Sequence, residues 1–156
     1  MSLDTTPMPR GPRSPDELTI GATAEESRRA SEWLASTCRE RGVPQAQIDG
    51  LTLCLDEALS NVIAHGGKSA LSEPITLRLD VAFDQPFNSV SVTLSDAGTA
   101  FDPLAAPERV PPKTLDEALP NGMGLGMIRR ICNFQHYSRA NGRNHLTLGM
   151  RWDEAE

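Results

Sequence analysis

Residues 51–67, LTLCLDEALSNVIAHGG, are the part of the sequence that decides the fold. Apolar residues recur through them at helical spacing, and the Gly66-Gly67 pair gives the helix a stop, because glycine accepts the left-handed turn that closes a helix. At about 100° per residue, these apolar side chains fall on one arc. They are Ile48, just before the stretch, Leu51, Leu55, Ala58, Leu59 and Val62. This arc predicts the face that packs into the core.

Two polar residues of the same helix lie off that arc. Glu57 and Asn61 are separated by one helical turn, and helical geometry places them beside Cys54 and Ala64. A carboxylate and an amide held together on an anchored helix present a base and an oxygen for a metal ion. A solvated polar face is the alternative, since most carboxylates on helices are unperturbed. The pair alone leaves both interpretations open.

Length and composition indicate one domain of ordinary size. The chain has 156 residues, and its 15 Lys and Arg against 21 Asp and Glu give a net charge of −6, which argues against a nucleic-acid partner. No apolar run approaches the roughly 18 residues of a membrane span, and the N-terminus carries no apolar signal segment. The three cysteines, Cys38, Cys54 and Cys132, are odd in number and widely spaced in the sequence. This pattern fits buried, reduced thiols better than disulfides or a metal site. We therefore expect a cytoplasmic protein without a membrane partner.

The order of the predicted elements indicates an α+β fold. Residues 1–16 are rich in proline and are predicted to be disordered, which leaves residues 17–156 for the domain. A polar loop is expected after Gly67. The order βαα-ββ-loop-α-ββ predicts a two-layer α/β sandwich, with a mixed, mostly antiparallel sheet and helices on one face. Strands are predicted near residues 18–20, 75–83, 90–94, 135–140 and 144–152, and helices near 23–41, 44–66 and 124–133.

A carboxylate and a glycine directly follow one predicted strand, in residues 95–103, SDAGTAFDP. A carboxylate at a strand end, such as that of Asp96, accepts a hydrogen bond from an exocyclic amine. Gly98 lets the backbone pack against a flat ring. An ordinary Asp-x-Gly turn is the alternative interpretation.

Glycines at alternate positions lead into the last predicted helix. In residues 121–128, NGMGLGMI, they are Gly122, Gly124 and Gly126. Such glycines let backbone N–H groups surround a polyphosphate at the positive end of a helix, although a flexible hinge has the same composition. The segment is not a Walker A loop, because no Gly-Lys-Ser/Thr follows. The long polar stretch that precedes it, residues 96–121, indicates a functional loop.

In order and spacing, these segments resemble the N, G1 and G2 boxes of the GHKL ATPase superfamily. The closest resemblance is to its stand-alone anti-sigma-factor serine kinases, which phosphorylate STAS-domain antagonists. It covers residues 18–152, and the fold it implies is the Bergerat ATP-binding fold with an ATP lid at residues 97–121. The matching segments are 56–66 (DEALSNVIAHG), 96–103 (DAGTAFDP), 119–130 (LPNGMGLGMIRR) and 144–148 (NHLTL).

The resemblance implies a role for each matched residue. Glu57 would be the catalytic base toward a serine hydroxyl, and Asn61 would bind the Mg²⁺ that bridges the ATP phosphates. Asp96 would accept a hydrogen bond from the adenine amine, and Gly98 would admit the ring. The triphosphate would be framed by the backbone of Gly122, Gly124, Leu125 and Gly126.

The function implied by the resemblance is that of an ATP- and Mg²⁺-dependent serine/threonine kinase in a partner-switching system. Its partners would be a STAS-domain antagonist and a sigma factor, and the chain would work as a homodimer with residues 18–22 as a contact. Two alternatives stay open. One is a nucleotide-dependent module that sequesters a partner without phosphorylating it, and the other is a stand-alone domain of the histidine-kinase type. Lys113, Arg129 and Arg130 would help to neutralise phosphate or would simply be solvated.

Overall fold

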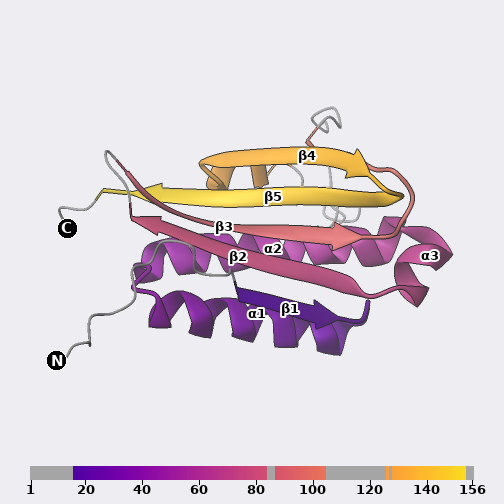
Figure 1. The fold of residues 1–156 in the computed structure, drawn as a ribbon, viewed down its shortest axis with the longest axis horizontal. Helices are drawn as coiled ribbons and strands as arrows, with labels where there is room; N and C mark the ends of the chain where they lie inside the picture. Colours follow the sequence, from indigo (N-terminus) through magenta and orange to yellow (C-terminus); the bar gives the residue numbers. More distant parts are fainter. Residues whose placement is uncertain (1–15, 84–86, 105–125, 127, 154–156) are drawn as a thin grey trace, which may run out of the picture.

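Two long helices cover one face of a five-stranded sheet (Figure 1). A computed structural model describes residues 16–83, 87–104, 126 and 128–153. Its helices are α1 (Ala24–Glu40), α2 (Gln45–His65) and α3 (Gly67–Ser72). Its strands are β1 (Asp16–Ile20), β2 (Ile75–Phe83), β3 (Asn88–Asp96), β4 (Phe134–Ala140) and β5 (Arg143–Trp152). Residue 126 and residues 128–131 are also helical.

The strands follow the order β1-β2-β3-β5-β4, so β1 and β4 are the edges of the sheet (Figure 1). All four pairs described are antiparallel, so the sheet is more uniform than the mixed arrangement that we predicted. Asn141 and Gly142 join β4 to β5 with positive φ angles of 55° and 74°, as the predicted hairpin turn requires. The α+β class, the two layers and the helices on one face are confirmed.

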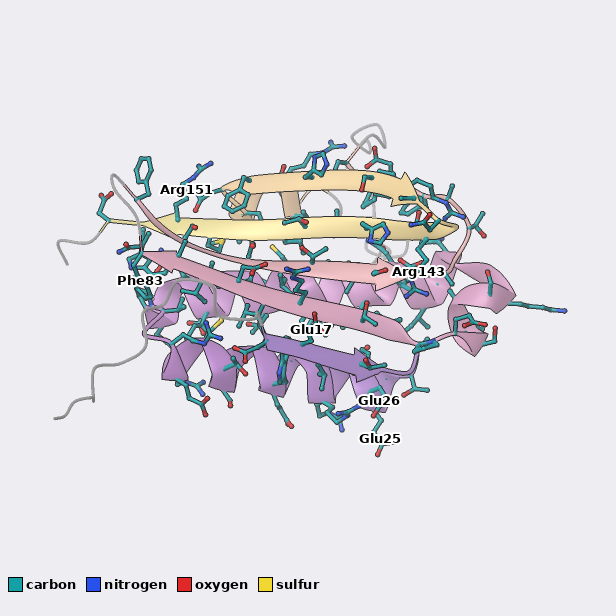
Figure 2. All side chains as sticks on the ribbon, viewed as in Figure 1. Glu17, Glu25, Glu26, Phe83, Arg143 and Arg151 are labelled. Atoms are coloured by element: carbon teal, nitrogen blue, oxygen red, sulfur yellow. The ribbon has the colours of Figure 1, made fainter. Side chains whose placement is uncertain are left out.

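The cap of α1 follows the sequence signal with one change. The N–H of Glu26 donates to Oγ1 of Thr23 at 3.1 Å, as in a capping box. The carboxylate of Glu26 accepts instead from the N–H of Gly21, at 3.0 Å. This second bond joins the end of β1 to the first turn of α1. Figure 2 shows Glu26 and its neighbour Glu25 at this end of the helix layer.

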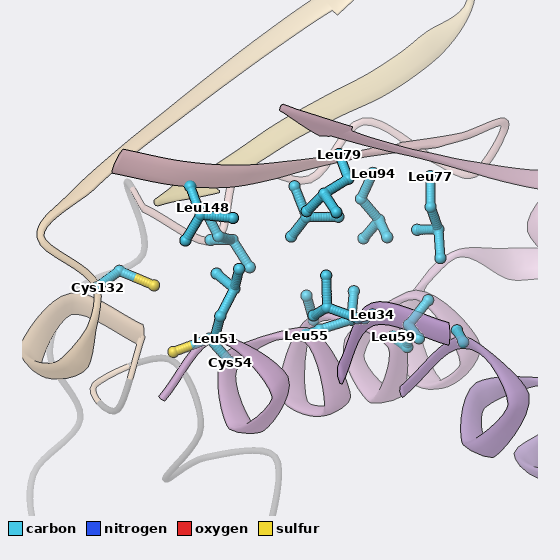
Figure 3. Packing of buried hydrophobic residues seen from close by; sticks show 14 of the residues in the cluster. Leu34, Leu51, Cys54, Leu55, Leu59, Leu77, Leu79, Leu94, Cys132 and Leu148 are labelled. Atoms are coloured by element: carbon cyan, nitrogen blue, oxygen red, sulfur yellow. The ribbon is translucent and has the colours of Figure 1, made fainter. Parts of the chain in front are cut away.

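The predicted apolar arc of α2 is the centre of the core (Figure 3). Ile48, Leu51, Leu55, Ala58 and Leu59 are at most 2% exposed, and Val62 packs at the edge of the same cluster. Strands β2, β3 and β5 contribute the opposite wall, with alternate residues facing the helices. Because α2 is fixed along its whole apolar side, the polar residues on it have defined positions.

One local expectation was wrong. The residues after Gly67 form the short helix α3 rather than a polar loop, because Ala70 is buried and anchors the turn. Cys54 is fully buried and carries a free thiol, as predicted from the sequence. The predicted disordered segment, residues 1–16, lies outside the described residues except for Asp16. Within the described part of the chain, no helix has the length and apolar character needed to cross a membrane.

Candidate functional site

A pocket lies between the last turns of α2 and the ends of β3 and β5. Asn61 and Asp96 are both in its wall, although they are far apart in the sequence. The other lining residues are mostly apolar and fit a flat ring better than a strongly charged ligand. The full lining is Ala58, Asn61, Val62, His65, Gly66, Leu94, Asp96, Thr99, Phe101, Pro103, Tyr137, Asn144 and Leu146.

Asp96 is the acidic residue of this pocket and is only 5% exposed. Its Oδ1 atom accepts from the N–H of Gly98 at 2.8 Å and from Nδ2 of Asn144 at 3.1 Å. Neither bond uses Oδ2, so this oxygen is left to accept from a ligand. The arrangement suits an exocyclic amine, and the role of Asp96 toward such a group stays a prediction.

Asn144 is the hydrogen-bonding centre of the pocket, and it is 6% exposed. Its Nδ2 atom donates to Asp96 and also to the carbonyl oxygen of Thr99, at 3.0 Å. Its Oδ1 atom accepts from the hydroxyl of Tyr137 and from the guanidinium of Arg139, the latter at 3.1 Å. One side chain on β5 therefore joins the end of β3, the loop that follows and the edge strand β4.

Gly98 allows a close approach that the sequence did not predict. A Cβ atom there would lie 2.9 Å from Oδ1 of Asp96 and 2.9 Å from both the Cα and the carbonyl oxygen of Gly66. The N–H of Thr99 donates to that same carbonyl oxygen at 3.0 Å. Arg139 donates to the carbonyl oxygen of Gly98 at 2.8 Å. The loop after β3 is thus fixed against the end of α2.

Glu57 and Asn61 each have a buried polar atom without a partner. The atoms are Oε2 of Glu57 and Nδ2 of Asn61, and neither forms a hydrogen bond with the part of the chain that the structure describes. Asn61 is 4% exposed. Buried polar groups nearly always form hydrogen bonds in folded proteins. Two such groups one helical turn apart, neither bonded to a described residue, therefore indicate a ligand site. The solvated polar face that was left open for this pair is excluded for Asn61.

Burial is the main cause that raises the pKa of Glu57 above its ordinary value, and the negative charge of Asp56 adds to the effect. Burial also raises the pKa of Asp56, against a hydrogen bond with Ser31 that lowers it. A carboxylate with a raised pKa is a better proton acceptor than a solvated one. Glu57 therefore has the character of a general base.

The aromatic rings of His65 and Phe101 stack at the pocket, with centroids 5.5 Å apart and planes at 29°. They come from the end of α2 and from the loop after β3, so the stack joins the two sides of the pocket. Arg129, which we considered as a phosphate ligand, donates to the carbonyl oxygen of Leu104 at 2.8 Å. Arg130 lies beside Gly126 and is exposed.

The glycine-rich loop is only partly described. Gly122, Gly124 and Leu125, together with Lys113 and residues 105–121 of the predicted lid, lie outside the described residues. Gly126 is helical but does not line the pocket. The structure therefore joins Asn61, Asp96 and Gly98 at one place, with Glu57 one turn away, and it leaves the triphosphate role of the loop as a prediction.

The residues present fit Mg²⁺ and ATP. Nδ2 of Asn61 has no hydrogen bond with the described residues. The oxygen of the same buried amide is the kind of ligand that a hard cation takes. Oδ2 of Asp96, which takes part in neither of the two bonds described above, and the apolar walls suit an adenine ring. Within the same part of the chain, no group of His, Cys, Asp and Glu residues forms a metal cage by itself. A bound ion would therefore need oxygens from the nucleotide.

Sequence reasoning missed Asn144, Tyr137 and Arg139 as site residues. Asn144 was noted only as part of a matching strand, and the other two were not considered. They are found only through the register of β4 and β5, which sets Arg139 opposite Asn144 and Tyr137 opposite Leu146. A polar residue at the start of a buried strand was the one available signal.

Asn144→Ala should weaken both the fold and the pocket. It would leave Asp96, Arg139 and the carbonyl oxygen of Thr99 short of partners, and each buried unsatisfied group costs about 1–3 kcal/mol. We expect the free energy of unfolding to fall by about 2–3 kcal/mol, measured by chemical denaturation. Asn133→Ala is the control, because Asn133 is exposed and accepts one backbone hydrogen bond. Equal losses in both variants would contradict the central role of Asn144.

Comparison with known proteins shows the family of the chain. Residues 20–151 match the model of the Histidine kinase-like ATPase domain, and the chain belongs to this family. The resemblance to the GHKL superfamily is thereby confirmed. The chain is also 35% identical over 134 residues to the Serine/threonine-protein kinase BtrW of Bordetella bronchiseptica, which covers 85% of this chain and 91% of BtrW.

A solved structure shows the same fold. The crystal structure of the RsbU and RsbW domains of Rv1364c from Mycobacterium tuberculosis is similar with a TM-score of 0.63 and 19% identity. The similarity covers 89% of this chain and 32% of the longer one. The identity is too low to transfer an activity, but the likeness confirms the predicted Bergerat fold.

Proposed function

We propose that this chain is an ATP- and Mg²⁺-dependent serine/threonine protein kinase. The observation that carries the proposal is the pair of Glu57 and Asn61 beside the pocket of Asp96. Each has a buried polar atom that forms no hydrogen bond with the described residues. The match to a family of ATPase domains and the similarity to a curated serine/threonine kinase support it.

In the proposed reaction, ATP is the substrate that supplies the phosphoryl group, and bound Mg²⁺ neutralises its phosphate charge. Asp96 and Gly98 hold and orient the base. Asn61 holds the cation through its amide oxygen. Glu57 takes the proton from the acceptor hydroxyl as its oxygen attacks the γ-phosphorus, and the bond from that phosphorus to the bridging oxygen breaks, so that ADP leaves. Phosphoryl transfer depends mainly on positioning and charge stabilisation, which these fixed side chains supply.

The partners follow from the same family argument. We propose that the acceptor is a serine of a STAS-domain antagonist and that the chain also holds a sigma factor inactive. It would work in the cytoplasm as a homodimer. β1 is a candidate contact because it is an edge strand, and a free edge offers unpaired backbone groups.

The proposal is tested by incubating the chain with Mg²⁺, ATP and each STAS protein of the same organism, followed by intact mass measurement. We expect one STAS protein to gain a single phosphate on serine. ATP binding without any phosphate gained would favour the sequestering module, which is the second candidate function. Phosphate gained on histidine would favour the histidine-kinase type instead. A chain that binds no ATP would contradict all three.

The decrease of the transfer rate at acidic pH, which is the acidic limb of the pH–rate profile, should reflect protonation of Glu57. Since burial and Asp56 raise its pKa, the ionised base should be lost at a higher pH than for a free glutamate, and transfer should fall there as pH decreases. Asp56→Asn removes one cause of the shift, so the limb should move to lower pH. Glu40→Gln changes an exposed carboxylate of α1 and should leave the limb in place. A limb unchanged by Asp56→Asn would contradict the assignment.

A further inference from the structure

Cys54 and Cys132 meet inside the core. Cys54 lies on α2, and Cys132 directly follows the helical residues 128–131, with exposed fractions of 0% and 5%. The thiols of Cys54 and Cys132 lie within hydrogen-bonding reach of each other. Figure 3 shows the two sulfur atoms facing the same gap between α2 and the segment that carries Cys132.

A glycine brings these two segments together. Gly50 lies one turn before Cys54 on α2, and Ile131 is the neighbour of Cys132 in the sequence. A Cβ atom at Gly50 would lie 3.1 Å from Cγ2 of Ile131 and 3.0 Å from Cε of Met150. Glycine inside a helix costs about 1 kcal/mol relative to alanine, so the close approach explains a residue that helix propensity disfavours.

The backbone on the Cys132 side is also fixed. The N–H of Cys132 donates to the carbonyl oxygen of Ile128 at 3.0 Å, and that of Asn133 donates to the carbonyl oxygen of Gly149 at 2.8 Å. Nε2 of Gln135 donates to the carbonyl oxygen of Cys132, also at 3.0 Å. The contact between the sulfurs is therefore held from both helices and from β5.

The two sulfurs are not equivalent. The neighbouring thiol of Cys54 lowers the pKa of Cys132, and the backbone of Gly149 adds to the effect, while burial opposes it. The contact with Cys132 and burial raise the pKa of Cys54. Cys132 is also the more exposed of the two, at 5% against 0% for Cys54. A thiolate is the nucleophile in thiol oxidation and needs access to the oxidant, so Cys132 is the sulfur that reacts first and Cys54 the one that resolves.

We propose that Cys54 and Cys132 form an oxidation site that a hydroperoxide converts into an intramolecular disulfide. The thiolate of Cys132 attacks one peroxide oxygen, the O–O bond breaks, and the other oxygen leaves as water or an alcohol after taking a proton. The sulfur of Cys54 then attacks the sulfenic acid of Cys132. An S–S bond forms, the S–O bond breaks, and the hydroxyl leaves as water with the proton of Cys54. The two thiols lose two electrons and the hydroperoxide gains them.

The disulfide would join α2 to the chain that follows residues 105–125, where the lid is predicted. Cys54 is three residues before Glu57, so the cross-link would be attached one turn from the proposed base. The oxidation site does not depend on the proposed kinase activity, because it uses neither Glu57 nor the pocket of Asp96.

The test treats the reduced, full-length chain with hydrogen peroxide, blocks the remaining thiols with iodoacetamide in denaturant and measures the intact mass. We expect a product lighter by two hydrogens in which only one cysteine is alkylated. Cys38→Ala is the matched control and should retain this mass loss with no alkylation. Cys38 is equally buried, but it is hydrogen-bonded to no other sulfur in the described chain, and burial raises its pKa to about 11. Cys54→Ala and Cys132→Ala should both abolish the loss.

Three results would overturn the proposal. They are an unchanged mass, oxygen added without loss of hydrogen, and a loss of hydrogen that persists in Cys54→Ala or Cys132→Ala. Peptide mapping of the oxidised wild-type chain gives an independent readout if either variant fails to fold. It must find the peptide of Cys54 linked to that of Cys132, and any other linkage contradicts the assignment.

Discussion

Replacing Glu57 by glutamine is expected to abolish phosphoryl transfer and to leave ATP binding intact. Glutamine keeps the shape of the side chain but cannot take the proton of the acceptor hydroxyl. A positioned general base contributes about 10²- to 10⁴-fold to a rate, and we expect a loss of that size in single-turnover transfer to the STAS partner. ATP affinity, measured by calorimetry, should stay within about twofold, because Asp96 and Asn61 are untouched.

Stability separates this effect from damage to the fold. Burial disfavours the ionised form of Glu57, so the neutral amide should leave the free energy of unfolding unchanged or raise it. A variant that is at least as stable as the wild type but inactive would be the signature of a catalytic group. Glu40→Gln, on the exposed end of α1, should change neither activity nor stability. Full activity in Glu57→Gln would show that another group acts as the base.

Replacing Gly98 by alanine is expected to weaken both the fold and ATP binding. The new Cβ would lie 2.9 Å from the Cα and carbonyl oxygen of Gly66 and from Oδ1 of Asp96. Backbone atoms cannot swing aside as the end of a side chain can, and overpacking of this kind costs about 1–3 kcal/mol. If the clash is relieved by moving Asp96, part of this cost appears as a loss of ATP binding. Each ~1.4 kcal/mol of binding free energy lost weakens ATP affinity about tenfold.

The matched control is Gly21→Ala. A Cβ atom at Gly21 would meet nothing closer than 3.9 Å, and the N–H that donates to Glu26 is retained. We expect wild-type ATP affinity and a free energy of unfolding that is equal or slightly higher, since alanine reduces the entropy of the unfolded chain. Thermal denaturation with and without ATP measures both quantities. An unchanged response of Gly98→Ala to ATP would contradict the close packing of the loop on Gly66.

The sequence predicted most of the fold because its strongest signals are local. The apolar period of α2, the alternation in β2 and β5 and the Asn141-Gly142 turn each depend on neighbouring residues. Asp96 and Asn61 were predicted through motifs whose spacing is also local. Their meeting in one pocket required the resemblance to a family, since no periodicity predicts which strand end lies beside which helix.

The parts that were missed depend on pairing between distant strands. Asn144 lies opposite Asp96 only because β3 and β5 pair in one register, and a shift of one residue would turn its side chain to the other face of the sheet. The contact between Gly98 and Gly66 and that between Cys54 and Cys132 are equally non-local. The short helix α3 was missed for a different reason, because its six residues are too few to show a helical period.

The pairing of β3 with β5 has a consequence for how the chain varies and how it folds. Asp96 and Asn144 are register partners, so strand pairing holds the two ends of the chain between them close together, whatever the length of that chain. The entropy of closing a flexible loop grows only logarithmically, at about 0.6 kcal/mol for each doubling of length. Insertions between these strands should therefore be tolerated thermodynamically. The same non-local pairing delays the closing of the sheet, so longer insertions should slow folding more than they lower stability.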